Sequence, residues 1–262
     1  MNEDRTQRIG KAFGAAAEHY EEHAGVQRVV AETLARLLRL QPVRPAPDGR
    51  LRILEIGCGT GLLTRQLRSL FQDAEIVASD ISPEMIRQAE RGGDTGAHFL
   101  VMDGEAPVFE GAHFDLIASS LAFQWFADLP RALDRLTALL RPGGSLMFAT
   151  MARRSFHEWR TAHEILGLQA GTPLYPDADD LRAMLSQHAD AFLFEEDYIH
   201  DFGGARGLLE HLKGIGATVP VAGREPLSAG QMRKVMRTYD EDGGTCTYHV
   251  AFARVTRIAE GV

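Results

Sequence analysis

A buried strand that runs directly into a glycine turn, within residues 51–61 (LRILEIGCGTG), constrains the fold of this chain more than any other stretch. The leucines and isoleucines of its first half are typical of a parallel strand buried on both faces. Residues 62–71 follow with leucines at helical spacing. Strand, glycine turn and helix in this order predict an open parallel sheet that binds a nucleotide-like ligand at its carboxyl edge, where glycines let the backbone approach the ligand.

The glycine spacing indicates which ligand the turn holds. A dinucleotide fingerprint reads GxGxxG, but its third glycine position falls on Leu62. The chain instead carries Glu55-x-Gly57-x-Gly59-x-Gly61, which resembles motif I of the class I S-adenosylmethionine (SAM) methyltransferases. SAM has a sulfonium and an ammonium in place of a pyrophosphate, so an acidic strand end suits it. For the glycines taken alone, a generic turn in another doubly wound protein is the alternative.

Length and charge bound the remaining possibilities. A chain of 262 residues fits one large domain, or one domain with an elaborate lid. Its net charge of −8 leaves no electrostatic footprint for nucleic acid. Two cysteines, Cys58 and Cys246, without a ligand-spaced Cys/His cluster, predict neither a disulfide framework nor a metal site. The charged start lacks a signal-peptide pattern, and no apolar run approaches about 20 residues. We therefore expect a cytoplasmic protein that binds no membrane.

Strand-like and helix-like segments alternate along most of the chain. Strands are expected at residues 51–56, 75–79, 97–102, 114–120, 145–150, 191–200 and 246–255. Helices are expected at residues 4–24, 26–40, 62–71, from Ser82 onward, 128–140, 154–168, 177–188, 208–217 and 228–239. This alternation predicts an α/β, Rossmann-like fold, with a seven-stranded, mostly parallel sheet and helices on both faces.

We expect one domain over residues 1–262. Within it we distinguish an N-terminal helical cap, a proline-rich linker, a donor-binding core and two segments of an inserted helical lid. These parts span, in that order, residues 1–41, 41–49, 50–150, and 151–190 with 203–240.

Further motifs extend the resemblance to the class I methyltransferases over roughly residues 50–150. They are Asp80, Asp103-Gly104, Phe114-Asp115-Leu116 and the RPGG of residues 141–144. Narrower stretches are similar to the malonyl-acyl-carrier-protein O-methyltransferases of biotin synthesis. They are AFG at 12–14 with Tyr20, SLAFQW at 120–125, LKGIGAT at 212–218, Gly223-Arg224, and TYH at 247–249. LKGIGA is the most specific of these, because general methyltransferases do not need it. One departure is Ser119-Ser120, where the fourth strand of the superfamily often ends near an Asn.

The resemblance implies SAM-dependent methylation of the free carboxylate of a malonyl thioester on acyl carrier protein or coenzyme A. The resulting ester lets fatty-acid synthesis elongate the chain toward the pimeloyl precursor of biotin. It implies SAM as cofactor, S-adenosylhomocysteine as product, acyl carrier protein as partner, and no metal. Asp80 would accept hydrogen bonds from the ribose hydroxyls and Asp103 from the adenine amino group, with a turn or capping role as the alternative for each. The expected donor-binding set is Glu55, Gly57, Cys58, Gly59, Gly61, Asp80, Ile81, Met85, Asp103, Gly104, Ser120 and Leu121.

A carboxylate substrate decides which side chains the reaction needs. It is already ionised at neutral pH, so no general base is required. The site must hold an oxygen about 3 Å from the methyl carbon, in line with the carbon–sulfur bond, and exclude water. The candidates are aromatic walls (Phe13, Tyr20, Phe123, Trp125), groups that orient the carboxylate (Tyr20, Gln124) and a cation that selects malonyl over acetyl (Lys213 or Arg224).

Each candidate has a structural alternative. Phe13 and Tyr20 would also pack a cap helix, Phe123 and Trp125 would suit a core, and Lys213 would suit a solvated helix end. Four histidines are assigned no chemistry: one occupies a strand position, where a structural role is expected, and three occupy surface positions on helices. These are His249 in the strand, and His19, His23 and His211 in the helices.

Acyl carrier protein is acidic, and so is this chain, so docking needs a local basic patch. We favour Arg153 and Arg154, with Arg160, just after the fifth strand. Two further basic sets are Arg233, Lys234 and Arg237, and Arg5, Arg8 and Lys11. For any single arginine, a solvated helix face is the alternative.

Two other functions stay open. One is methylation of a different small-molecule carboxylate, of the trans-aconitate type, and the other is SAM binding without catalysis. Methylation of nucleic acid on nitrogen is disfavoured by the charge. It is also disfavoured because SSLA, at residues 119–122, replaces the Asn/Asp-Pro-Pro-Tyr/Phe tetrapeptide after the fourth strand.

Overall fold

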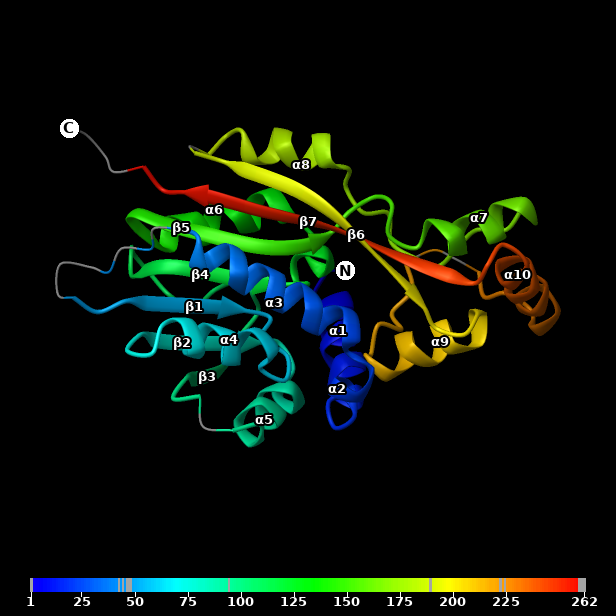
Figure 1. Cartoon of the computed structure of the whole chain (residues 1–262), viewed down its shortest axis with the longest axis horizontal. Coiled ribbons are helices and arrows are strands. Elements are labelled where there is room, and N and C mark those ends of the chain that lie inside the picture. The colour runs from blue at the N-terminus through cyan, green and yellow to red at the C-terminus, as the bar shows by residue number, and fades with distance from the viewer. Residues whose placement is uncertain are drawn as a thin grey trace.

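A single sheet of seven strands organises the chain (Figure 1). The computed structural model describes residues 2–41, 43, 45, 49–93, 95–188, 190–221, 223 and 225–258, with side chains from Arg5 onward. The strand order is β3-β2-β1-β4-β5-β7-β6. The strands are β1 Arg52–Ile56, β2 Glu75–Asp80, β3 His98–Val101, β4 Phe114–Ser120, β5 Leu140–Met151, β6 Phe192–Asp201 and β7 Thr245–Thr256. The 41–49 linker expected from the sequence falls largely outside the described residues.

Strand pairing confirms the predicted mostly parallel sheet. β1 pairs in parallel with β2 and β4, β2 with β3, and β4 with β5. Only β7 reverses direction, because it pairs antiparallel with both β5 and β6. The carboxyl ends of β1 to β5 therefore meet at one edge of the sheet, the edge at which open α/β sheets bind ligands.

Helices cover both faces of the sheet and gather at its carboxyl edge. The helices are α1 Asn2–Ala16, α2 Tyr20–His23, α3 Gly25–Arg39, α4 Leu62–Leu70, α5 Pro83–Arg91, η1 Phe123–Trp125, α6 Leu129–Leu139, α7 His157–Ile165, α8 Ala178–Leu185, α9 Ala205–Gly214 and α10 Ala229–Glu241. α3 and α4 bury apolar side chains against one face, and α6 does so against the other. In Figure 1, α7, α9 and α10 lie beyond the arrowheads of the central strands, on the right.

Local sequence signals explain where several helices begin. The Ser82 hydroxyl accepts a hydrogen bond from the Met85 amide, and Pro83 occupies the first turn of α5, as the sequence predicted. Asp128 caps α6 in the same way through the Arg131 amide. Residues 177–180 form a capping box at α8.

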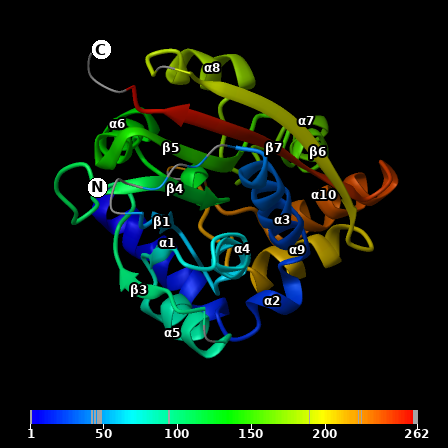
Figure 2. The same cartoon turned by 60° about the vertical axis from the view of Figure 1, so that its left-hand side comes forward.

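The predicted helix over residues 4–24 is wrong in one respect, because it is divided into α1 and α2. Tight hydrogen bonds from the amides of Ala17 and His19 to the carbonyls three residues earlier close α1, and Tyr20 begins the short α2. Figure 2 shows α1 beside α5, with which it is in contact. The division places α1, α2 and the start of α3 over the carboxyl edge of the sheet, and this brings Phe13 and Tyr20 to the site described next.

Candidate active site

A first cavity, here called the donor cavity, lies at the carboxyl ends of β1, β2 and β4. Gly57 and Gly59 of the turn after β1 adopt left-handed φ angles of 71° and 55°. A Cβ at Gly57 would lie 2.3 Å from the Cβ of Ala122, whereas a Cβ at Gly59 would meet no atom within 4 Å. Glycine at 57 therefore permits close packing behind the turn, and glycine at 59 keeps the backbone open to a ligand.

Carboxylates give the donor cavity its chemical character. Glu55, Asp80, Asp103 and Glu105 line it, and no Lys or Arg among the described residues does so. Glu55 is 1% exposed, and one of its oxygens accepts a hydrogen bond of 2.7 Å from the Thr64 hydroxyl. Burial raises the pKa of Glu55 to about 8; the Thr64 bond opposes this rise. Such a lining suits a ligand that carries positive charge and hydroxyl donors.

Asp80 is held in one orientation by the backbone. One of its oxygens accepts from the Gly59 amide at 2.9 Å, and the other accepts from the Ser82 amide at 2.8 Å. Burial still raises the pKa of Asp80 above its usual value, against the lowering effect of these bonds. A carboxylate has about four acceptor sites, so Asp80 keeps capacity to accept a hydrogen bond from a ligand hydroxyl such as that of a ribose.

The cap is tied to the donor cavity through Glu21 of α2. One Glu21 oxygen accepts from the Thr60 hydroxyl at 2.9 Å and from the Arg65 guanidinium at 2.7 Å. Burial would raise the pKa of Glu21, but the bonds from Arg65 and Thr60 hold it below its usual value. Since Thr60 belongs to the glycine turn and Arg65 to α4, these bonds hold α2 over the turn that would bind the donor.

A second cavity, here called the acyl cavity, adjoins the first beneath α7, α9 and α10. Aromatic and aliphatic side chains make up most of its lining. They include Met151, Phe156, Trp159, Tyr175, Leu209, Leu212, Ile215, Met232 and Tyr248. No Lys or Arg among the described residues lines this cavity either. Such a lining suits a slender, mostly apolar group.

Five residues line both cavities and define their junction: Phe13, Tyr20, Gln27, Leu121 and Trp125. Leu121 has a φ of 52°, a conformation that is strained for a branched side chain and is typical of functional sites. The rings of Phe13 and Trp125 meet edge to face with centroids 5.3 Å apart. Oε1 of Gln27 is buried without a hydrogen-bond partner, so it is available to a ligand at the junction.

Gln124 lines the acyl cavity next to this junction, with its carboxamide orientation fixed. Its Nε2 donates to the Leu121 carbonyl at 2.6 Å, and its Oε1 accepts a longer bond of 3.5 Å from the Thr150 hydroxyl. One N–H of the carboxamide is left for a substrate.

The structure brings together nearly all the residues expected around a donor. Eleven of the twelve line the donor cavity: Glu55, Gly57, Cys58, Gly59, Asp80, Ile81, Met85, Asp103, Gly104, Ser120 and Leu121. Gly61 does not line it; with a φ of 90°, it starts α4. At Gly104, a Cβ would lie 2.5 Å from a methyl carbon of Ile56, so its position is determined by packing as well.

Two expected substrate residues, Phe123 and Lys213, line neither cavity, and a third lies outside the described residues. Phe123 is 1% exposed and packs against Phe126 and Phe148 in the core, which is the structural alternative. Lys213 is exposed on α9 and lines neither cavity. Arg224 lies outside the described residues.

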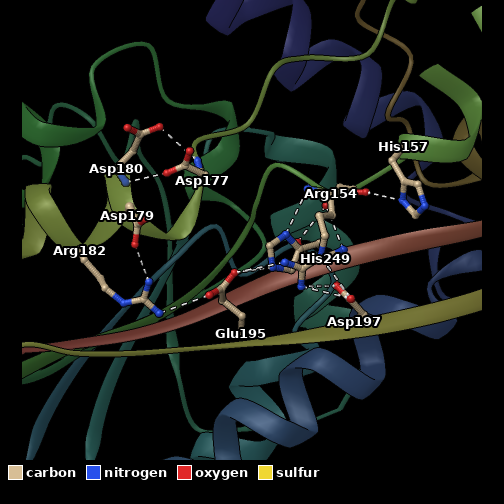
Figure 3. Close-up of polar contacts among 10 residues, drawn as sticks. Arg154, His157, Asp177, Asp179, Asp180, Arg182, Glu195, Asp197 and His249 are labelled. Atoms are coloured by element: carbon tan, nitrogen blue, oxygen red, sulfur yellow. Dashed lines mark hydrogen bonds and ion pairs between the residues drawn. The ribbon is translucent and has the colours of Figure 1, made fainter. Parts of the chain in front are cut away.

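Ion pairs neutralise Arg153 and Arg154 of the favoured basic patch, and Figure 3 shows those of Arg154. Arg153 contacts Asp177 at 3.0 Å and Asp180 at 3.4 Å. Arg154 contacts Asp197 at 3.1 Å and Glu195 at 3.7 Å. Because each guanidinium already faces two carboxylates, neither is a free cation for an acidic partner.

His249 lies within the same network and has the structural role that the sequence suggested. Its ring is 1% exposed, Nε2 lies 2.8 Å from Glu195, and Nδ1 accepts from the Arg154 amide at 3.1 Å. These contacts tie the turn after β5 to β7, and this turn carries Phe156 into the acyl cavity.

Sequence reasoning missed several residues of the two cavities. Gln27 lies on α3, and the leucine spacing of that helix indicates only which face is apolar, not that a polar side chain lines a cavity. Tyr175 lies in a loop, and Tyr248 was noted only as part of a motif. His211, interpreted as a surface position, is 5% exposed and bonded to Tyr248, so that interpretation is wrong.

Comparisons with known proteins agree with this geometry. A family model described as a methyltransferase domain matches residues 54–148, the strands and turns of the donor cavity. The malonyl-[acyl-carrier protein] O-methyltransferase of Magnetococcus marinus is 39% identical over 97% of this chain and 94% of its own length. The chain belongs to the malonyl-[acyl-carrier protein] O-methyltransferase family. This chain is also similar to the biotin biosynthesis bifunctional protein BioCD of Bordetella avium, with 46% identity over 94% of the chain. The match spans 51% of that longer protein.

Solved structures confirm the class I methyltransferase fold of this family member. The YcgJ protein of Bacillus subtilis matches with a TM-score of 0.60 at 14% identity, over 87% of this chain and 99% of that one. Among the described residues, no group of three or more His, Cys, Asp and Glu side chains is arranged to hold a metal ion. None of the described helices has the length and apolarity needed to cross a bilayer.

Proposed function

We propose that this chain transfers the methyl group of SAM to the free carboxylate of a malonyl thioester carried on acyl carrier protein. The product is the malonyl methyl ester used in biotin synthesis. The observation that carries the proposal is the junction of a carboxylate-lined cavity with an apolar one at Phe13, Tyr20, Gln27, Leu121 and Trp125. Family membership supports the same reaction.

The donor cavity fits SAM. Asp80 is the proposed acceptor for the ribose hydroxyls, and Asp103, which lines the same cavity, is the proposed acceptor for the adenine amino group. Glu55 and the unpartnered Oε1 of Gln27 supply acceptors for the ammonium group. When bound, SAM supplies an electrophilic methyl group on a positively charged sulfur.

The chain's own residues position the carboxylate rather than activate it. A malonyl carboxylate needs no base, because it is ionised at neutral pH. The free N–H of Gln124 and the hydroxyl of Tyr20 are the proposed donors that hold it in line with the methyl group. Trp125 and Phe13 form the walls and exclude water, so that the transfer proceeds in a dry, aligned site.

Selection of malonyl over acetyl then has a simple electrostatic origin. No Lys or Arg among the described residues lines either cavity. Within the described part of the chain, no cation lies closer to the substrate carboxylate than the sulfonium of the donor would. A neutral acetyl group would leave that charge and the Gln124 N–H unpaired, so we expect it to be rejected.

Docking of the carrier protein needs cations other than Arg153 and Arg154. Arg233, Lys234 and Arg237 of α10 are exposed, and none forms an ion pair among the described residues. On the same helix, Met232 lines the acyl cavity. We therefore place the proposed carrier contact on α10, where a thioester arm would reach the cavity from a protein held by positive charge.

Mass spectrometry of carrier proteins incubated with SAM tests this function. Malonyl, acetyl and succinyl carrier proteins are treated in parallel, and the mass of one added CH₂ group is expected on the malonyl species alone. Equal gain on all three, or on none, would contradict the proposal. Transfer to small carboxylates without a carrier would instead favour the trans-aconitate type of enzyme.

A further inference from the structure

We propose that His211 is a positioning residue for methyl transfer, because it ties α2, and with it Tyr20, to the wall of the acyl cavity. This inference rests on the proposed function, since Tyr20 is positioned for that transfer. His211 touches neither cavity; it acts through Tyr248 and through the main chain of His23.

His211 and Tyr248 form a buried pair between α9 and β7. Nε2 of His211 lies 2.7 Å from the Tyr248 hydroxyl, and the two side chains are 5% and 1% exposed. Phe202 stacks on the imidazole with ring centroids 4.3 Å apart. Tyr248 lines the acyl cavity, so its ring is fixed from behind by a side chain that itself has no freedom to rotate.

The other side of the imidazole is bound to the cap. Burial lowers the pKa of His211 to about 4, while a hydrogen bond with the main chain of His23 opposes this. The ring is therefore neutral at pH 7, with one donor and one acceptor nitrogen. The bond with the His23 main chain raises the pKa of His211, so it favours the protonated ring. In such a bond the ring N–H donates to the main-chain carbonyl. Nε2 is then the acceptor, and Tyr248 donates its hydroxyl proton to it.

Two glycines let α9 approach the cap closely enough for these bonds. A Cβ at Gly214 would lie 2.3 Å from Cγ and Cδ2 of His23. A Cβ at Gly216, where φ is 75°, would lie 2.7 Å from the carbonyl oxygen of Ala12 and 2.8 Å from Cα of Phe13. Any side chain at either position would push the cap away from α9.

These contacts connect sequence stretches that the resemblance singled out and that lie far from one another in the chain. The AFG stretch with Tyr20, the LKGIGA stretch and the TYH stretch are far apart in the chain but meet around His211. The cap residues Phe13 and Tyr20 line both cavities, and Tyr248 lines one. One buried histidine thus links the element that covers the donor to the wall that holds the acyl chain.

The test compares His211→Leu, His211→Gln and Tyr248→Phe with Tyr239→Phe in the full chain. Tyr239 is a matched control, because it too is a buried tyrosine whose hydroxyl makes one short bond, to the Thr245 carbonyl at 2.6 Å. A displacement of about 1 Å at a reacting group costs up to about 100-fold in rate. We expect His211→Leu to lower kcat by about 10- to 100-fold without changing the affinity for SAM.

Rescue and hydrogen exchange separate positioning from simple loss of stability. A carboxamide supplies both a donor and an acceptor, so His211→Gln should recover most of the rate. Amides of residues 12–23 should exchange faster in His211→Leu than in Tyr239→Phe. The proposal is overturned if His211→Leu keeps the wild-type kcat, or if Tyr239→Phe lowers kcat and speeds exchange equally. If the wild-type chain methylates nothing, the proposed function fails, but the exchange measurement still decides the role of His211.

Discussion

The side-chain carboxyl group of Glu55 accepts a hydrogen bond of 2.7 Å from the Thr64 hydroxyl at the floor of the donor cavity. Burial raises the pKa of Glu55 to about 8, so the donor-free enzyme holds a proton there at neutral pH. A cationic donor beside this group would lower its pKa. Donor binding is therefore coupled to the release of a proton.

SAM affinity should accordingly increase with pH up to about 8. Each pH unit in this window contributes at most about tenfold, since one pKa unit equals about 1.4 kcal/mol. Calorimetry in two buffers of different ionisation enthalpy measures the released proton directly. Glu55→Gln should abolish both the proton release and the pH dependence; unchanged values in this variant would mean that another group titrates.

Stability of the donor-free enzyme should change with pH in the opposite sense. A carboxyl whose pKa is raised on folding binds its proton more tightly in the folded state, so its stabilising contribution is complete below its unfolded pKa. That contribution is lost as pH rises through the folded value near 8. Thermal melts between pH 5 and pH 8 should therefore show a decline that is smaller in Glu55→Gln. A steeper decline in that variant would contradict this assignment.

Gln124→Glu should abolish turnover while leaving the fold intact. The new carboxylate would face both the Leu121 carbonyl and the substrate carboxylate, and like charges in a dry site repel strongly. We expect kcat/KM to fall at least about 100-fold, which is the size of the rate loss when one catalytic hydrogen-bond donor is removed. SAM binding should not change. Gln124→Met, which removes the hydrogen bond without adding charge, should lose less. Equal activity of Gln124→Glu and wild type would remove Gln124 from the substrate site.

Gly214→Ala should impair activity more than stability. Its Cβ would overlap the His23 ring and displace α2, and overpacking of this kind costs about 1–3 kcal/mol. Because α2 carries Tyr20, kcat should fall by about tenfold or more. Gly230→Ala on α10 is the matched control, since its nearest neighbour would be 3.9 Å away. Wild-type kcat in Gly214→Ala, with the melting temperature lowered, would show that the close contact serves stability alone.

Reversing charge on α10 should weaken use of the carrier-bound substrate. The double variant Arg233→Glu, Arg237→Glu is expected to raise KM for malonyl carrier protein about tenfold, or about 1.4 kcal/mol, more strongly at low salt. KM for malonyl-pantetheine, which has no carrier, should not change. Arg39→Glu with Arg91→Glu gives the same change in net charge at exposed ends of α3 and α5. A rise in KM of equal size in that control would mean that net charge, and not a docking surface, sets the affinity.

Local signals explain why the donor cavity could be predicted from the sequence. Glu55, Gly57 and Gly59 lie within one strand and the turn after it, and Asp80 is the last residue of the neighbouring parallel strand β2. Such residues meet because the carboxyl ends of neighbouring strands share an edge. No long-range packing needs to be known to place them together.

The acyl cavity could not be predicted in the same way, because its residues depend on which helix face turns inward. Lys213 and His211 are two positions apart on α9 and so point in nearly opposite directions. Lys213, for which the sequence predicts a role, is exposed, and His211, for which it predicts none, is buried. In the short turn η1, likewise, Phe123 faces the core while Gln124 and Trp125 face the cavity.

Charge on the surface was equally beyond local prediction. Arg153 and Arg154 looked like an unpaired basic patch in their own stretch of sequence. Their counter-ions come from a later loop and helix, and from β6, and include Asp177 and Asp197. Which arginines remain available to a partner depends on this tertiary pairing.

The most direct test of whether the two cavities join at one reaction centre uses SAM with a ¹³C-labelled methyl group. Malonyl carrier protein is incubated with this donor, and the product is analysed by NMR. We expect a single labelled methyl ester on the terminal carboxylate, from which mild base releases labelled methanol. Label on the malonyl α-carbon, or no transfer from an enzyme that still binds SAM, would contradict it.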